Sequence, residues 1–266
     1  MRRRMFVLAL PGLWPEATAR AADDAAVVAE WRRRFEAEVP RRLDVPEAER
    51  EYYAGLLDEA LATPGPDPGW PQSVLLVDRS EQGQAACVLL RPPGGAWYWL
   101  GATPASTGRV GAFEHFRTPL GVFLHGPHNP DYRALGTVNE LGIRGYGARG
   151  LRVFDFGWVT AERGWGRGGT GTMRLQVHAT DPVRLEPRLG RAASRGCIRI
   201  TAALNRFLDR HGLLDAEYDA AQAAGRRQWI LRPDRTTIPW PGRWLVVVDS
   251  QRRERPAWSP LPPARP

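Results

Sequence analysis

Lysine is absent from the 266-residue chain, so all 37 basic residues are arginines. This absence excludes Schiff-base lysines, the lysine of a phosphate-binding loop and Ser–Lys dyads. No stretch of 18 apolar residues occurs either, which excludes a protein with several membrane-spanning helices. Hydrophobic residues make up 43% of the chain, which suffices for a packed core and argues against a chain that is disordered throughout. The length predicts one domain with additional segments, or two small domains.

Cysteine is scarce as well. The chain has two, Cys87 and Cys197, which excludes a framework of several disulfides. The two residues either form a single bridge, or at least one is a free thiol. Cys87 lies in the apolar stretch from Ala85 to Leu90, so we expect it to be a buried core thiol.

The net charge of +8 is of the kind that nucleic-acid-binding proteins carry. The arginines, however, are scattered among acidic residues, and no zinc-finger, helix-turn-helix or RNA-binding signature occurs. We therefore expect no nucleic-acid partner.

Residues 1–22 have the layout of a secretory signal peptide, with an arginine-rich start, a short apolar stretch and an Ala-x-Ala site at residues 19–21. The alternative is a frayed N-terminal arm of a cytosolic protein. Cleavage after Ala21 removes four arginines and Glu16, and lowers the net charge from +8 to +5. We therefore expect an exported protein.

Residues 23–62 are predicted to form two helices. The second begins near Asp44, which is a suitable N-cap, with Pro46 in its first turn. The first carries apolar residues at spacings of three and four, as one helical face requires: Val28, Trp31, Phe35 and Val39. These helices either dock on the rest of the protein or form a stalk. Residues 63–71 contain four prolines and are predicted to be a linker.

From residue 72 onward the pattern favours strands, so the predicted class is mostly β (α+β). Short apolar segments separated by turn residues predict a three-stranded meander over residues 74–100. A helix is predicted at 202–211, with Thr201 as its N-cap and Gly212 at its end. Residues 213–266 are predicted to be a C-terminal extension with one strand at 244–249 and a proline-rich tail. Further strands are expected near 121–124, 151–156 and 173–178.

The strongest indication of chemistry surrounds Cys197. Gly196 precedes it and permits a tight turn that exposes the sulfur, with the N–H groups of both residues facing a developing oxyanion. Arg195 and Arg199 flank the thiol and favour its thiolate form. His178 ends a predicted strand and is a suitable general base for such a nucleophile. The alternative from the residues alone is that Cys197 is a small buried apolar residue.

Two segments resemble markers of the L,D-transpeptidase catalytic domain (the YkuD-like family). In the first, His178 is followed, after 15 residues, by Ser194-Arg-Gly-Cys-Ile-Arg199. In the second, Ser106-Thr-Gly108 is followed by Thr118-Pro-Leu-Gly-Val-Phe123. The resemblance covers residues 72–212. It implies a β-sandwich catalytic domain with a short helix after the catalytic cysteine, preceded here by a small helical segment.

The resemblance implies an enzyme that acts on the tetrapeptide stems of bacterial peptidoglycan, in cell-wall organisation and the control of cell shape. Cys197 would attack the carbonyl of the third stem residue, the terminal D-Ala would leave, and a thioester would form. An amine of a second stem would then give a 3→3 cross-link. Water as acceptor would give an L,D-carboxypeptidase, and a protein amine would attach a protein to the wall. A wall-binding module without catalysis is a further alternative.

The resemblance also implies roles for individual residues. His178 would be the base, the N–H groups of Gly196 and Cys197 would form the oxyanion hole, and Ser194 would shape the turn. Arg199, Arg195 and Ser194 are predicted to bind substrate, and Arg199 would pair with a substrate carboxylate because a planar guanidinium suits that geometry. The family uses no cofactor, and we expect a monomer.

Two positions depart from the family pattern. Arg195 stands where the family usually has a histidine, and Ala179 follows the catalytic histidine where glycine or serine is common. In the family, the residue before Gly-Cys is thought to orient the catalytic histidine through its backbone carbonyl. Arg195 retains a carbonyl, so we expect activity to survive the replacement.

Three segments rich in glycine and aromatic residues, 125–131, 142–147 and 161–166, are predicted either to cover the active site or to be ordinary connections. His125 and His128, together with His178, raise the possibility of a zinc site. The prolines at 127 and 130 disfavour a pair of ligands on one helix, so we expect no metal. His115 and His211 are predicted to be surface or cap residues.

Overall fold

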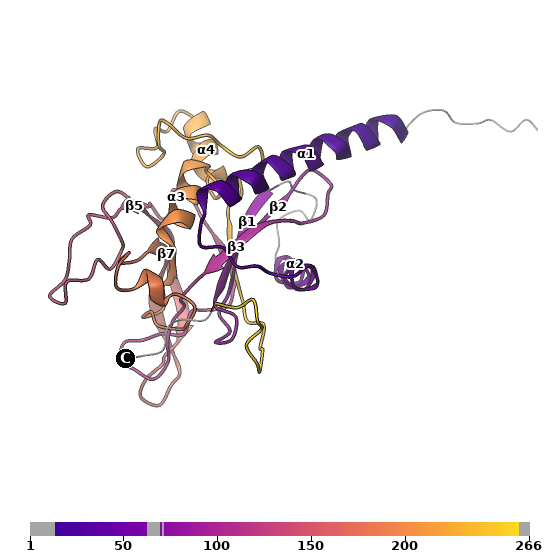
Figure 1. The fold of residues 1–266 in the computed structure, drawn as a ribbon. Coiled ribbons are helices and arrows are strands. Elements are labelled where there is room, and N and C mark those ends of the chain that lie inside the picture. Colours follow the sequence, from indigo (N-terminus) through magenta and orange to yellow (C-terminus); the bar gives the residue numbers. More distant parts are fainter. Residues whose placement is uncertain (1–13, 63–69, 71, 261–266) are drawn as a thin grey trace, which may run out of the picture.

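The computed structural model describes residues 14–62, 70 and 72–260, with side chains from residue 22 onward. This part of the chain is a mixed α/β structure with two β-sheets and four α-helices (Figure 1). The helices are α1 (Trp14–Glu38), α2 (Glu47–Leu61), α3 (Ala202–Arg210) and α4 (Ala216–Ala223), and a 3-10 turn, η1, spans Glu186–Arg188. The strands are β1 (Gln72–Asp78), β2 (Ala85–Arg91), β3 (Tyr98–Pro104), β4 (Gly121–Leu124), β5 (Tyr132–Arg133), β6 (Arg152–Glu162), β7 (Thr170–Ala179), β8 (Ile198–Ile200) and β9 (Trp244–Val248).

The first sheet has the strand order β3-β2-β1-β9-β4. Strands β1, β2 and β3 pair antiparallel in sequence order, which confirms the predicted meander. Strand β9 pairs parallel with β1 and antiparallel with β4. The segment after residue 212 therefore supplies an interior strand of the sheet, rather than an appendage to it.

Helices cover both faces of this sheet because the β1 side chains alternate between the faces. Leu75 and Val77 join a cluster with the buried stripe of α1, while Val74 and Leu76 join a second cluster with α2. The predicted stripe is confirmed as buried, since Val28, Trp31 and Phe35 on α1, and Val39 directly after its end, are at most 5% exposed. Phe35 lies against β3 so closely that a Cβ at Gly101 would be 2.1 Å from its ring.

The second sheet has the order β5-β6-β7-β8 and carries the histidine and the cysteine singled out above. The long hairpin of β6 and β7 is antiparallel, whereas β8 pairs parallel with β7. Helix α3 starts directly after β8, and the Thr201 hydroxyl accepts the Leu204 N–H at 3.1 Å, as predicted. His211 is the C-cap of this helix.

Both helix starts differ from the prediction. Helix α1 already begins at Trp14, because the alanine-rich sequence around the expected cleavage site favours helix, so that site lies within the helix. Helix α2 has Pro46 as its N-cap, without a side-chain cap, so the Asp44 cap was wrong. Proline suits this position because its fixed φ and missing N–H cost little there.

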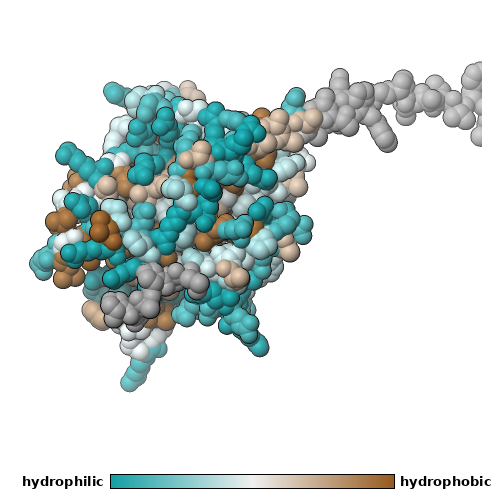
Figure 2. Space-filling view, viewed as in Figure 1, coloured by the Kyte–Doolittle hydropathy of each residue, from teal (hydrophilic) through white to brown (hydrophobic). Residues whose placement is uncertain are grey.

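Residues 1–13 of the expected signal peptide, most of the expected linker (63–69 and 71) and residues 261–266 lie outside the described residues. Among the described helices, none has the length and apolar character needed to cross a bilayer. The surface is largely hydrophilic in Figure 2. Apolar side chains gather at its left, the side on which Figure 1 places the loop after β5.

Candidate active site

The parallel pairing of β7 with β8 sets the positions of the candidate nucleophile and base. His178 lies opposite Arg199 in the register, and Cys197 lies two residues before Arg199. Paired residues of neighbouring strands project from the same face, so His178 and Arg199 share a face of the sheet. Cys197 lies in the bend that immediately precedes β8. At ordinary strand spacing and rise, a residue two positions before Arg199 has its Cα about 8 Å from that of His178, so the two predicted residues lie in neighbouring segments.

The turn before Cys197 requires glycine and is fixed by Ser194. Gly196 has φ +133°, and a Cβ there would lie 2.6 Å from the Met173 sulfur. The Ser194 Oγ accepts the Gly196 N–H at 3.0 Å and donates to the Cys197 carbonyl. Ser194 therefore lies where a turn-shaping residue should. The Gly196 N–H, expected to face an oxyanion, is bonded to this hydroxyl instead.

The two sequence markers meet at this turn. The backbone groups of Ser106 and Arg199 exchange two hydrogen bonds of 2.9 Å. The Thr118 hydroxyl accepts the Gly108 N–H at 2.8 Å and donates to the Gly196 carbonyl at 2.7 Å. The second marker, Ser106–Gly108 with Thr118, therefore supports the cysteine loop of the first marker through these hydrogen bonds.

His178 is held as a neutral base. Its side chain is 5% exposed, and its Nδ1 bonds to the Ala179 carbonyl at 2.6 Å. A carbonyl only accepts, so Nδ1 carries the hydrogen and Nε2 has the free lone pair. Burial, assisted by the positive charge of Arg199, lowers the pKa of His178 to about 4. The Arg195 carbonyl, expected to orient the imidazole, instead accepts the Phe116 N–H at 3.1 Å.

Cys197 is a partly buried free thiol that donates to the Arg174 carbonyl at 3.5 Å. Burial raises the pKa of the thiol, and this outweighs the Gln176 N–H and the Arg199 charge, both of which favour the thiolate. Arg199 therefore acts in the expected direction, but burial outweighs it, and the pKa of the thiol is raised overall. The Arg195 side chain is 73% exposed and lies 3.8 Å from Glu114, so it points away from the sulfur.

Sequence reasoning missed a polar network beside the pair. The Tyr146 ring packs edge-on against His178 with centroids 4.7 Å apart, so the segment 142–147 does cover the histidine. Its hydroxyl donates to the Gln176 side chain at 3.2 Å, and Gln176 donates to Asp155 at 2.7 Å. Gln176 could have been found from the sequence, because it precedes His178 by two residues on a strand and so shares its face.

The other two glycine-rich segments have different roles. His125 is fully buried and bonds to Asp131 at 3.0 Å and to the Leu214 carbonyl at 2.7 Å, which makes it part of the core. His128 is exposed. In the described part of the chain, no group of three or more His, Cys, Asp or Glu side chains could hold a metal ion. In the segment 161–166, Trp165 packs edge-on against Phe116.

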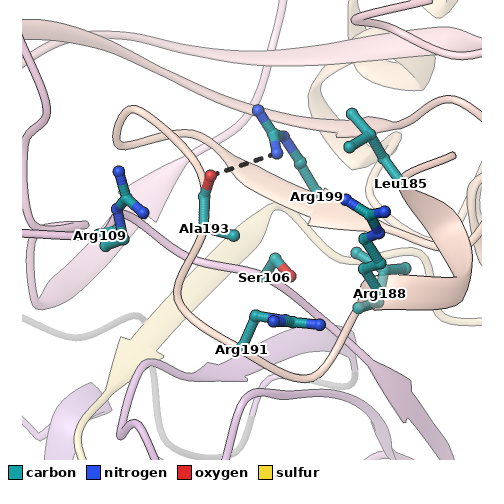
Figure 3. Close-up of a pocket in the computed structure, with 8 residues that line it drawn as sticks. Ser106, Arg109, Leu185, Arg188, Arg191, Ala193 and Arg199 are labelled. Atoms are coloured by element: carbon teal, nitrogen blue, oxygen red, sulfur yellow. Dashed lines mark hydrogen bonds between the residues drawn. The ribbon is translucent and has the colours of Figure 1, made fainter. Parts of the chain in front are cut away.

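A cavity of about 330 Å³ adjoins the site at Arg199 (Figure 3). The Arg199 guanidinium donates to the Ala193 carbonyl at 3.4 Å. Ser106 and Ala193 line the cavity together with Arg199, so its walls are shared with the cysteine loop and with the marker that supports it.

Comparison with known proteins gives little information about the family or the function of this chain. No family model matches it, and no curated protein matches it. Among solved structures it is similar to the helical cell shape determining protein Pgp2 from Campylobacter jejuni, at 14% sequence identity and a TM-score of 0.34. The match covers 76% of this chain and 56% of that one, so the chain spans little more than half the length of that protein.

Proposed function

We propose that the chain is a cysteine-dependent L,D-transpeptidase that acts on the tetrapeptide stems of peptidoglycan through a thioester at Cys197. The observation that supports this proposal is the parallel pairing of β7 with β8, in which His178 lies opposite Arg199, two residues after Cys197. The support of the cysteine turn by Ser106–Gly108 and Thr118 adds to it, because the turn belongs to one of the two markers that resemble the family and the supporting residues belong to the other.

The chemistry follows from the protonation states of the two residues. The thiol of Cys197 attacks the carbonyl of the third stem residue while His178 Nε2 takes its proton. The bond to the terminal D-Ala breaks, its nitrogen takes the proton from the imidazolium, and the acyl group remains on sulfur as a thioester. An acceptor amine then attacks the thioester and gives a proton to His178, the C–S bond breaks, and the sulfur takes that proton back from the imidazolium, which restores the thiol and the neutral imidazole. We place this reaction in the periplasm and assign it to a monomer.

The decisive experiment is intact-mass analysis after incubation with a stem tetrapeptide or a carbapenem. We expect the mass of one acyl group on the wild-type chain and on Cys87→Ala, in which Cys197 is the only thiol. The adduct is expected to be absent from Cys197→Ala and much slower to form with His178→Asn. A wild-type protein that forms no adduct, or an equal adduct on Cys197→Ala, would refute the proposal.

The same incubation separates the alternatives. A 3→3 linked dimer identifies an amine acceptor, whereas a tripeptide identifies water and hence an L,D-carboxypeptidase. The exposed Arg195, in the place of the family histidine, motivates the non-catalytic alternative. Sedimentation with peptidoglycan without any thioester would indicate such a wall-binding module.

A further inference from the structure

The cavity beside Arg199 is lined by four arginines that come from separate segments. Arg109 follows the Ser106–Gly108 marker, Arg188 ends η1, Arg191 precedes the cysteine loop, and Arg199 lies in β8. Figure 3 shows the four side chains around Ser106. Of the eight described residues that line the cavity, none is acidic. The wall of the cavity therefore carries four positive charges and offers no negative charge of its own, which favours an anionic ligand.

The size of the cavity indicates what kind of anion fits. A volume of about 330 Å³ is at the lower end of small-molecule sites, so it holds more than a single ion. Each guanidinium can pair with a carboxylate through two parallel hydrogen bonds. Four arginines therefore suit a segment of ligand that carries two or more carboxylates.

The cavity is also fixed relative to the nucleophile. The Arg109 N–H donates to the Ser194 carbonyl at 3.0 Å, and the Ala193 N–H donates to the Thr107 carbonyl at 2.9 Å. Arg199 lies two residues after Cys197, in the strand that begins directly after the cysteine. Carboxylates bound here are therefore held at a set distance from the sulfur, as positioning of an acyl donor requires.

We propose that this four-arginine cavity is a donor subsite that selects stem peptides whose side-chain carboxylates are free rather than amidated. The inference rests on the proposed function and extends it beyond Arg199 to Arg109, Arg188 and Arg191. Conversion of a carboxylate to a carboxamide preserves shape and removes the charge, so the cavity distinguishes the two forms by electrostatics. The carboxylate that leaves with the terminal D-Ala is not the one recognised here.

The test is a calorimetric titration of the Cys197→Ala protein, which binds without turnover. Its two ligands are a stem tetrapeptide with free side-chain carboxylates and the same peptide amidated at those positions. We expect amidation to weaken binding about tenfold or more, because hydrogen bonds to charged groups are the stronger ones. Arg109→Gln and Arg188→Gln, each added to Cys197→Ala, should remove most of this difference.

Arg253→Gln on the exposed C-terminal segment is the matched control and should leave the difference unchanged. The two cavity variants are tested separately, so that a folding defect in one leaves the other informative. Equal affinity for the two peptides, or full discrimination by both cavity variants, would overturn the inference. So would inorganic phosphate that displaces the free peptide at equimolar concentration, since the cavity would then be a phosphate site.

The transpeptidase proposal and the subsite proposal can be refuted independently of each other. A carbapenem adduct on the wild-type protein, without discrimination between the two peptides, leaves the transpeptidase proposal standing and removes the subsite. Discrimination in the calorimeter, without any adduct on Cys197, leaves the subsite standing and removes the acyl-enzyme.

Discussion

Burial acts in opposite directions on the two residues of the candidate site. It lowers the pKa of His178 to about 4 and raises the pKa of the Cys197 thiol, so at neutral pH both groups are uncharged. In a pre-formed ion pair the thiolate would already be present before substrate arrives. In the proposed reaction the proton therefore moves from sulfur to nitrogen only as the substrate reacts, the role of a general base.

This protonation state predicts the pH dependence of alkylation. In the Cys87→Ala chain, the rate with iodoacetamide should be low at pH 7 and rise with pH until above pH 9, because the thiolate is the reactive form. Replacement of Arg199 by Gln should shift the profile to higher pH, since the positive charge that favours the thiolate is gone. The rate is followed by loss of free thiol over a pH series.

Two results would bear on this prediction. Cys197→Ala serves as the control, because its remaining thiol, Cys87, is fully buried and should stay unmodified in the folded protein. A rate that is already maximal below pH 7 would contradict the prediction and indicate a thiolate–imidazolium pair.

At the scale of single elements, the sequence predicted those strands and helix ends that are determined by residues close to one another in the chain. The meander β1–β3, strand β9 and the Thr201 cap of α3 are confirmed, since turn residues and apolar alternation determine them locally. The placement of β9 between β1 and β4 was not predicted. That pairing joins residues about 170 positions apart, and local patterns carry no information on such a partner.

The candidate site shows the same division. The sequence identified His178, Cys197 and the glycine turn, because the types and spacing of these residues carry the resemblance. It did not identify Tyr146, whose contact with His178 comes from the path of a long loop. The sequence analysis also predicted that Arg195 lies beside the sulfur of Cys197. In the structure the Arg195 side chain is largely exposed and lies near Glu114.

The support of the cysteine loop predicts a strong effect at one glycine. A Cβ at Gly108 would lie 2.0 Å from the Phe116 carbonyl oxygen and 2.9 Å from the Gly196 Cα. Both are backbone atoms, which cannot move away without straining the chain around them. Gly108→Ala should therefore reduce the free energy of unfolding by about 3 kcal/mol and lower the melting temperature by about 5–10 °C. The rate of carbapenem acylation should fall as well.

The control for this change is Gly145→Ala, because nothing lies within 4 Å of a Cβ at that position. Its effect should stay within about 0.5 kcal/mol. Thermal melts and acylation rates on both variants test the argument. Equal stability of the two variants would show that the marker does not constrain the turn.

At the scale of the whole molecule, segments from both ends of the chain complete one structure. Strand β9 fills the interior of the first sheet, and α1 packs on the same sheet while also reaching α3. The rings of Trp31 and Phe35 meet His211 and Phe207 edge-on, with centroids 5.0 and 5.1 Å apart. Helix α1 is therefore docked along its second half, and it is not merely a stalk.

This docking predicts different outcomes for two N-terminal truncations. The buried stripe of α1 begins at Val28, so a chain that starts at Ala22, as after cleavage of the expected signal peptide, keeps every one of its contacts. A chain that starts at Pro40 loses four large apolar side chains that contribute about 2 kcal/mol each, which is comparable with the net stability of a typical domain. Thermal melts should show an unchanged midpoint for the first and a large loss or no cooperative transition for the second. An unchanged midpoint for the chain from Pro40 would contradict the docked helix, and a large loss for the chain from Ala22 would show that residues before the stripe hold the fold together.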